Sequence, residues 1–139
     1  PLEPQPASPK PTSSNDTIYM ARDFMREMVA RTMNPNGLTE AEFNQACAET
    51  LARIEAALED ADLDFETPAD GIVEIAFDDG GKIIVNRHGV AREIWVAARS
   101  GGFHFKPQAG DWVDTRDGTP LFDRLAALIA AQGGGAVEF

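Results

Sequence analysis

The sequence predicts an α+β protein, a two-layer α-β sandwich in which N- and C-terminal helices pack on one face of an antiparallel sheet. Three observations predict it. A helical apolar period begins at Thr39, short alternating segments separated by turn residues follow from Ile72, and a second helical period begins near Thr119. Because all the strands lie between the two helices and short turns join them, we expect one meander with both helices on one face.

The first 37 residues differ in composition from the rest. Residues 1–16 contain five prolines with Ser, Thr and Asn, and such a segment offers little to bury. A short helix is expected from Ile18 to Arg31, before breakers at Asn34, Pro35 and Gly37. We therefore expect residues 1–37 to be a flexible extension, whose native origin the sequence leaves open, and residues 38–139 to be the folded domain. A targeting segment is a weaker alternative, because acidic residues are interspersed among the arginines of this region.

The first helix of the domain has a clear start. Thr39 and Glu42 form the capping-box pattern, and Leu38 and Phe43 are spaced as a hydrophobic staple. At 100° per residue, one face collects the side chains expected in the core, namely Phe43, Cys47, Thr50, Leu51, Ile54, Ala57 and Leu58. The other face collects Glu42, Glu49, Glu55, Glu59 and Asp60. The helix should therefore bury one face and present carboxylates on the other.

The strands and the last helix follow from alternation and turn signals. The expected strands are Ile72–Phe77, Lys82–Asn86, Ala91–Ala98, Phe103–Lys106 and Asp111–Val113. The Asp78–Gly81 turn joins the first two as a hairpin, and residues 87–89 form the next turn, which places His88 at the surface. Thr119 is expected to cap the last helix, with Pro120 at its first position and Gly133 after its end.

Alternation also predicts which side chains stand on the face of the sheet that the helices leave uncovered. Ile94 and Val96 should point toward the helices, so Trp95 should point outward, with His104 beside it on the next strand. Tryptophan is enriched at binding hot spots. An outward Trp95 is therefore either a partner contact or a ring covered by neighbouring side chains, and the sequence leaves both open. Trp112 is better explained by core or edge packing.

Charge narrows the classes of function. From Glu40 to Glu66 there are nine carboxylates and one base, Arg53, and the whole chain carries a net charge of -11. Such a balance argues against binding to nucleic acid or to anionic membranes, and it favours hard cations and basic protein surfaces. The single cysteine, Cys47, excludes a disulfide framework and a multi-thiolate metal site within one chain. With no apolar run near the roughly 18 residues needed to span a bilayer, we expect a soluble cytoplasmic protein.

No catalytic constellation is evident. The sequence shows no nucleophile paired with a base and no glycine loop that would cradle a phosphate before a helix. We therefore expect a protein that is not an enzyme.

Several segments together resemble one family. They are Asp62–Glu66, Lys82–Arg87, Ile94–Phe105, and Trp112 with Asp114, Arg116, Asp117 and Gly118, and in this order they resemble the frataxins, with the bacterial CyaY-type proteins nearest. The likeness runs from Gly37 to Phe139 and does not include the extension. It departs from several bacterial relatives at Asn44 and Ala56, where a histidine or an acid can occur, so the number and order of metal sites stay open.

The resemblance implies a two-layer sandwich that binds ferrous or ferric iron weakly at its surface and serves iron–sulfur cluster assembly. The implied partners are the cysteine desulfurase and the iron–sulfur scaffold machinery. The resemblance also implies a monomeric protein that can oligomerise with iron. The implied metal-binding residues form what we call the acidic ridge: Glu42, Glu49, Glu55, Glu59, Asp60, Asp62, Asp64 and Glu66. The implied partner-binding residues are Trp95, Glu55, Glu59 and Asp60.

Ligand chemistry agrees with this picture. Carboxylate oxygens suit hard cations, but a convex helix face cannot wrap an ion as a loop can, so affinity should be modest and other divalent ions should compete. Two alternatives remain open: ferroxidase or iron-storage activity on the ridge, and an acidic interaction module whose metal binding is incidental. Inward-facing Glu and His ligands on facing helices, as in di-iron bundles, are lacking, which weighs against efficient ferroxidase chemistry. His104 is a candidate for a second metal site, for the Trp95 contact, or for a structural strand histidine.

Overall fold

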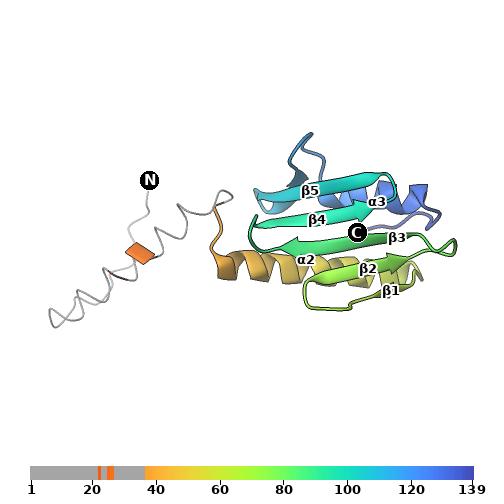
Figure 1. The fold of residues 1–139 in the computed structure, drawn as a ribbon, viewed down its shortest axis with the longest axis horizontal. Helices are drawn as coiled ribbons and strands as arrows, with labels where there is room; N and C mark the ends of the chain where they lie inside the picture. The colour runs from red at the N-terminus through yellow and green to blue at the C-terminus, as the bar shows by residue number, and fades with distance from the viewer. Residues whose placement is uncertain (1–21, 23–24, 27–36) are drawn as a thin grey trace.

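The computed structural model describes residues 37–139 and, before them, Arg22, Met25 and Arg26. The expected helix from Ile18 to Arg31 and the boundary at residue 37 fall largely outside the described residues. From Gly37 onward the elements are α2 (Glu40–Asp60), β1 (Phe65–Glu66), β2 (Ile72–Ala76), β3 (Lys82–His88), β4 (Glu93–Ala98), β5 (Gly101–Gln108), β6 (Asp111–Asp114) and α3 (Leu121–Ala131). Figure 1 shows the sheet in front and both helices behind it.

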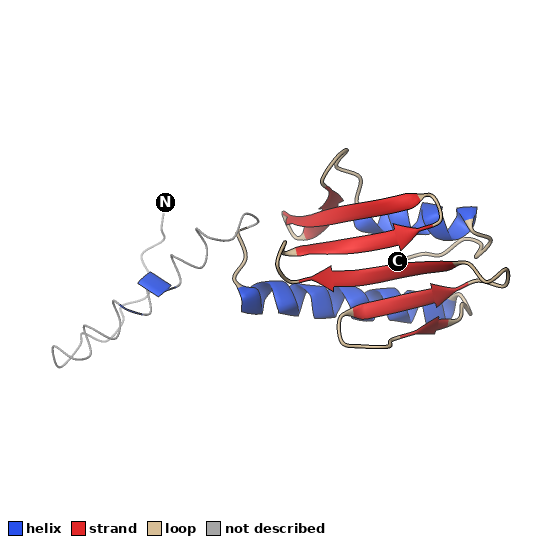
Figure 2. Cartoon of the chain, viewed as in Figure 1, coloured by secondary structure: helices blue, strands red, loops and turns tan. Residues whose placement is uncertain are grey.

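The sheet is one antiparallel meander of six strands in the order β1-β2-β3-β4-β5-β6. Figure 2 shows the two layers, with α2 behind the β2 side of the sheet and α3 behind the β5 side. The predicted two-layer sandwich is therefore confirmed. The short strand β1, which pairs Phe65 with Ile75 and Glu66 with Glu74, was not predicted, because two residues are too few to show alternation.

Helix α2 begins as its sequence predicts. The Thr39 hydroxyl accepts a hydrogen bond from the Glu42 amide at 3.2 Å, and the Thr39 amide donates to the Glu42 carboxylate at 2.9 Å. Six of the seven side chains expected inside are buried: Phe43, Cys47, Leu51, Ile54, Ala57 and Leu58. The seventh, Thr50, is half-buried and accepts a hydrogen bond at 2.8 Å from the indole N–H of Trp112, which is 6% exposed. Trp112 is thus a core residue tied to α2.

The start of α3 differs from the prediction by one position. Pro120, not Thr119, is the N-cap, and no side chain caps the helix. The Thr119 hydroxyl accepts from Arg124 instead, while its carbonyl accepts from the Asp114 amide at 2.8 Å. Thr119 thereby forms hydrogen bonds to both β6 and α3. The helix ends before Gly133, whose φ of +92° suits glycine.

The turn between β3 and β4 also lies later than predicted. Arg87 pairs with Ile94 and His88 with Glu93, so two of the three residues expected in the turn belong to β3. The chain reverses after His88, where Arg92 takes the left-handed conformation with φ 54°. Because the pairing continues two residues further, the His88 side chain lies on the outer face of the sheet beside Trp95 and not on a turn.

Candidate functional site

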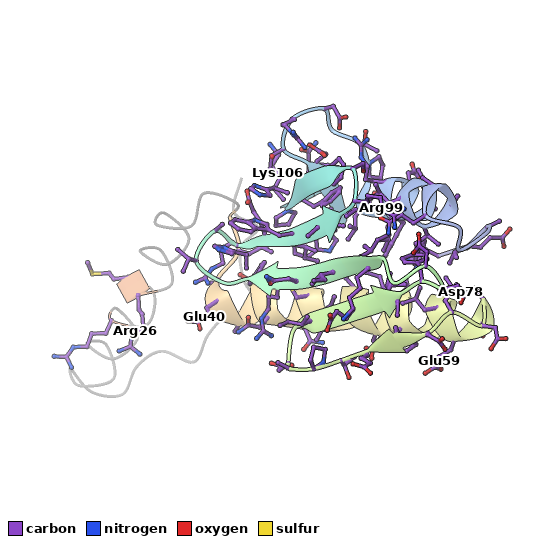
Figure 3. All side chains as sticks on the ribbon, turned by 45° about the vertical axis from the view of Figure 1, so that its right-hand side comes forward. Arg26, Glu40, Glu59, Asp78, Arg99 and Lys106 are labelled. Carbon is purple, nitrogen blue, oxygen red and sulfur yellow. The ribbon has the colours of Figure 1, made fainter. Side chains whose placement is uncertain are left out.

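The acidic ridge occupies α2 and the segment that follows it. Five of its carboxylates lie on α2, Asp62 and Asp64 lie in the link to β1, and Glu66 lies in β1. All are exposed except Glu55, which is half-buried. Figure 3 labels Glu40 and Glu59 at opposite ends of α2. The predicted ridge is therefore spread along the full length of the helix and around its C-terminal end.

Basic side chains do not neutralise most of the ridge. Within residues 37–139, no Lys or Arg forms an ion pair with Glu49, Glu55, Glu59, Asp60, Asp62, Asp64 or Glu66. Glu42 serves the capping box, and Glu49 accepts from the Gln45 side-chain amide at 3.0 Å. The base in this region, Arg53, donates to the Phe139 backbone oxygen at 2.9 Å and lies over the Phe122 ring.

Several acidic residues outside the ridge form ion pairs. Glu74 pairs with Lys82 at 3.1 Å, Asp70 with Arg87 at 3.1 Å, and Asp79 with Arg99 at 2.8 Å. Hydrogen bonding from Arg99 lowers the pKa of the Asp79 carboxyl below its ordinary value. These described bases thus pair with acids of the sheet and its turns. Apart from Glu42, the ridge carboxylates form no ion pair with a base of residues 37–139.

The ridge offers carboxylates singly or in small sets. In the described part of the chain, no three His, Cys, Asp or Glu side chains converge to form a metal cage. Glu55 lines a hollow of about 390 Å³ together with Asp70 from the β1–β2 loop. The charged residues that line a second hollow of about 390 Å³ are Asp64, Glu66, Glu74 and Lys82, and Lys82 pairs with Glu74. A cation here would keep several water ligands.

Asp70 and Glu74 were missed at the sequence level. Glu74 faces Glu66 across the β1–β2 pairing, a contact that depends on strand register. The alternation of Ile72–Ala76 contained a usable signal, because it places Glu74 on the opposite face from Val73 and Ile75. Asp70 lies in a loop, where periodicity carries no information. Glu42, in the first turn of α2, and Glu49, in the middle of the helix, do not line either hollow.

Trp95 points away from the helices as predicted, and it is also covered. Its indole lies between the imidazole of His88, with centroids 3.7 Å apart and planes at 11°, and that of His104, at 4.2 Å and 5°. The indole N–H donates to the Glu93 carboxylate at 2.9 Å. Trp95 is therefore half-buried, and the accessible part of the ring is its edge.

A shallow hollow of about 170 Å³ lies beside the Trp95 edge on the outer face of the sheet. Its lining residues are Ile84, Asn86, Trp95, Val96, Ala97, Gly102, Phe103 and His104. Gly102, opposite Ala97 in the β4–β5 pairing, contributes no side chain, and a Cβ built there would meet no atom within 4 Å. The glycine therefore leaves this part of the hollow open.

Buried ionisable groups lie apart from these surfaces. Cys47 is fully buried, and burial raises the pKa of its thiol to about 12, although the charge of Arg87 partly opposes the shift. Because its side chain is fully buried among core residues, this thiol takes no part in the acidic ridge. Asp114 is 3% exposed and accepts from the Arg116 amide at 2.7 Å, so it stabilises the loop before α3. Among the described helices, none is both long enough and apolar enough to cross a bilayer.

Comparisons with known proteins agree on one family. The family model described as a frataxin-like domain matches residues 36–135. The iron–sulfur cluster assembly protein CyaY of Dechloromonas aromatica is 53% identical over 102 residues, which cover 72% of this chain and 97% of that protein.

Two solved structures share the fold. A frataxin from Psychromonas ingrahamii, 26% identical, superposes with a TM-score of 0.68 over 73% of this chain and 97% of its own. A trimeric frataxin from the yeast Saccharomyces cerevisiae, complexed with ferrous iron, is 24% identical with a TM-score of 0.57 and covers 63% of this chain and 84% of its own. At that identity, the second likeness concerns the fold alone.

Proposed function

The chain belongs to the frataxin family, and from that premise we propose that it binds iron weakly on the acidic ridge and regulates or supplies iron–sulfur cluster assembly. It does so in the cytoplasm by contact with a cysteine desulfurase and the scaffold machinery. The relative from Dechloromonas aromatica is named an iron–sulfur cluster assembly protein, and the likeness spans nearly its whole length. That coverage supports a role of the same kind.

The observation that carries the proposal is the set of ridge carboxylates at the C-terminal end of α2, Glu55, Glu59 and Asp60, which no base of residues 37–139 neutralises. Like charges placed four apart on a helix destabilise it, and negative charge near a helix C-terminus opposes the helix dipole. Glu55 and Glu59 are four apart, and the last turn of α2 contains Glu59 and Asp60 with no basic residue. The helix thus retains charges that lower its own stability. A bound cation or a basic protein surface would relieve that repulsion.

The geometry favours weak and exchangeable iron binding. A hard cation on a convex face takes one or two carboxylates and keeps its remaining positions for water. Nothing on the ridge supplies soft ligands or a fixed geometry that would select iron over manganese. A partner docked on the ridge can supply the missing ligands, so weak binding suits a protein that passes iron on or senses it.

Ferroxidase activity has less support from the site. An efficient di-iron centre needs several carboxylates and histidines converging on two ions, and the described residues hold no set of three such ligands. Ferrous iron turnover under oxygen no faster than that of an equally acidic unrelated protein would remove this alternative.

The test compares charge reversal on and off the ridge. The ridge variant is Glu59→Lys with Asp60→Lys, and its matched control, Asp123→Lys with Glu138→Lys, makes the same change in net charge at exposed positions elsewhere. Anaerobic ferrous iron is titrated into each protein and followed by amide NMR. Association is measured with the purified cysteine desulfurase and scaffold of Dechloromonas aromatica at several salt concentrations.

The ridge variant should lose the iron-dependent changes at α2, and it should bind the desulfurase more weakly with a shallower salt dependence. The control should keep most of both properties. Trp95→Ala should weaken association and leave iron binding intact. Iron that leaves every α2 amide undisturbed in the unmodified protein, or equal losses in the ridge variant and the control, would contradict the proposal.

A further inference from the structure

Three aromatic rings form a continuous stack across the outer face of the sheet. His88 comes from the end of β3, Trp95 from β4 and His104 from β5. Trp95 and His104 are direct partners in the β4–β5 pairing, while His88 lies diagonally from Trp95, opposite Glu93. The two nearly parallel ring pairs, at 3.7 and 4.2 Å, place the indole between two imidazoles.

Each imidazole also has a polar neighbour. The His88 Nδ1 accepts a hydrogen bond at 3.2 Å from the Ala91 amide in the β3–β4 turn. The His104 Nδ1 lies 3.8 Å from the Glu93 carboxylate, which also accepts the Trp95 N–H. Glu93 has a side chain only 18% exposed, so it is a fixed acceptor on the same face. The stack and the acceptor together fix the indole in one orientation.

This arrangement decides what Trp95 can offer a partner. Both faces of the ring are covered and its N–H is already bonded, so the indole cannot stack on a partner side chain or donate a hydrogen bond to one. Its exposed edge forms one wall of the 170 Å³ hollow with Ala97 and Gly102. The surface available for contact is thus a rigid apolar edge beside a recess.

We propose that His88 and His104 are positioning residues that hold Trp95 edge-outward for its contact with the cluster-assembly partner. The inference rests on the proposed function, because it concerns how that function's sheet surface is prepared. An indole already fixed before binding loses no rotamer freedom when the partner arrives. Without the two imidazoles, the ring turns about its side-chain bonds, and binding must then immobilise it.

The experiment uses double substitutions of His88 and His104. They distinguish the effect of a flat ring beside the indole from the effect of the imidazole nitrogens. In His88→Ala with His104→Ala, both faces of the indole are opened. In His88→Phe with His104→Phe, a flat ring is retained on each side, but the ring nitrogens and their polar contacts are removed. Trp95→Ala removes the contact itself. Association of all three full-length variants is measured with the cysteine desulfurase and scaffold of Dechloromonas aromatica.

The alanine pair should bind about two- to tenfold more weakly than the unmodified protein, the range expected when one more side chain must be immobilised. The phenylalanine pair should bind within about twofold of the unmodified protein by the same argument. Ferrous iron binding to the ridge should be unchanged in both pairs. Thermal unfolding should show that each variant is folded.

A second readout reports on the indole directly. The protein has two tryptophans, whose indole N–H groups give separate NMR signals. Hydrogen exchange at the Trp95 N–H should quicken in the alanine pair and stay slow in the phenylalanine pair. The Trp112 N–H, bonded to Thr50 on the other side of the sheet, is the internal reference and should not change.

Three outcomes would overturn the inference. In the first, Trp95→Ala weakens binding but the alanine pair binds as well as the unmodified protein. This result would leave the proposed function standing. Another is weakened binding with an unchanged Trp95 N–H, or an equal loss in the phenylalanine pair, since either would mean that the histidines contact the partner themselves. In the third, Trp95→Ala has no effect, and the proposed sheet contact fails together with this inference.

Discussion

Neutralising one carboxylate at the end of α2 should make the metal-free protein more stable. Glu59 lies in the last turn of the helix, is exposed, and lies four residues after Glu55 with no described base paired to it. Glu59→Gln keeps the size and the helix propensity of the side chain and removes only its charge. Because most surface substitutions are neutral or destabilising, a gain in stability here is a specific expectation.

The magnitude follows from two terms. Removing a negative charge from the C-terminal turn of a helix recovers about 0.3–1 kcal/mol at low ionic strength. Removing the repulsion between Glu55 and Glu59 recovers about 0.2–0.5 kcal/mol. The free energy of unfolding should therefore rise by about 1 kcal/mol, which for a domain of this size is roughly 4–8 °C in Tm. High salt should reduce the gain, because both terms are screened.

Helix α2 also provides the control. Glu40 lies in the first turn of α2, where negative charge favours the helix dipole, so Glu40→Gln should lower the free energy of unfolding by about 0.3–1 kcal/mol. Both residues appear at opposite ends of the helix in Figure 3. Thermal unfolding at low salt, with and without Mn²⁺, measures both variants. Added Mn²⁺ should stabilise Glu59→Gln less than the unmodified protein. A lowered Tm for Glu59→Gln, or shifts of the same sign in both variants, would refute the reasoning.

Other predictions concern the core and the loop before α3. Thr50→Val removes the acceptor of the buried Trp112 N–H and should cost about 1–3 kcal/mol in denaturant unfolding; an unchanged midpoint would contradict this. Cys47, with its thiol pKa raised to about 12 by burial, should be alkylated at pH 8 only as fast as the protein unfolds, so rapid labelling of the folded protein would count against the structure. Hydrogen bonds from the Thr119 amide and, next, from Arg124 lower the pKa of the Asp117 carboxyl from 3.8 to about 2. The contribution of this carboxylate to stability should therefore be lost as the pH falls from about 4 to about 2. In Asp117→Asn, Tm should fall less steeply over the same pH interval.

Local features of the fold were predictable from the sequence because their signals are local. The capping box of Thr39 and Glu42, the buried face of α2 and the outward direction of Trp95 each follow from a repeat of a few residues. The features that were missed depend on register or on very short elements. Strand β1 has two residues. The start of α3 shifted because the Thr119 hydroxyl bonds to the Arg124 side chain and does not cap a backbone amide of the helix.

The same distinction applies to the candidate site. The residues of the ridge could be predicted, since their charge and helical spacing are visible, but their roles as metal ligands and partner contacts stay predictions. The environment of Trp95 could be predicted only in part: alternation places His104 beside it, but not His88. Whether His88 lies in a turn or beside Trp95 depends on where β3 ends, and a difference of one residue would move its side chain to the other face.

The two proposed surfaces lie on different sides of the molecule. Helix α2 covers one face of the sheet, whereas Trp95 and its stack stand on the other, with strands β2 and β3 between Trp95 and the β1 edge. No described ion pair or hydrogen bond links the stack to the ridge. A compact basic protein that meets Glu59 therefore does not reach Trp95 unless it extends around the β1 edge. The arrangement suits an assembly in which one component contacts the ridge while another occupies the outer face of the sheet. Iron on the ridge would then be presented at one side of such an assembly while Trp95 fixes the orientation of the domain from the other.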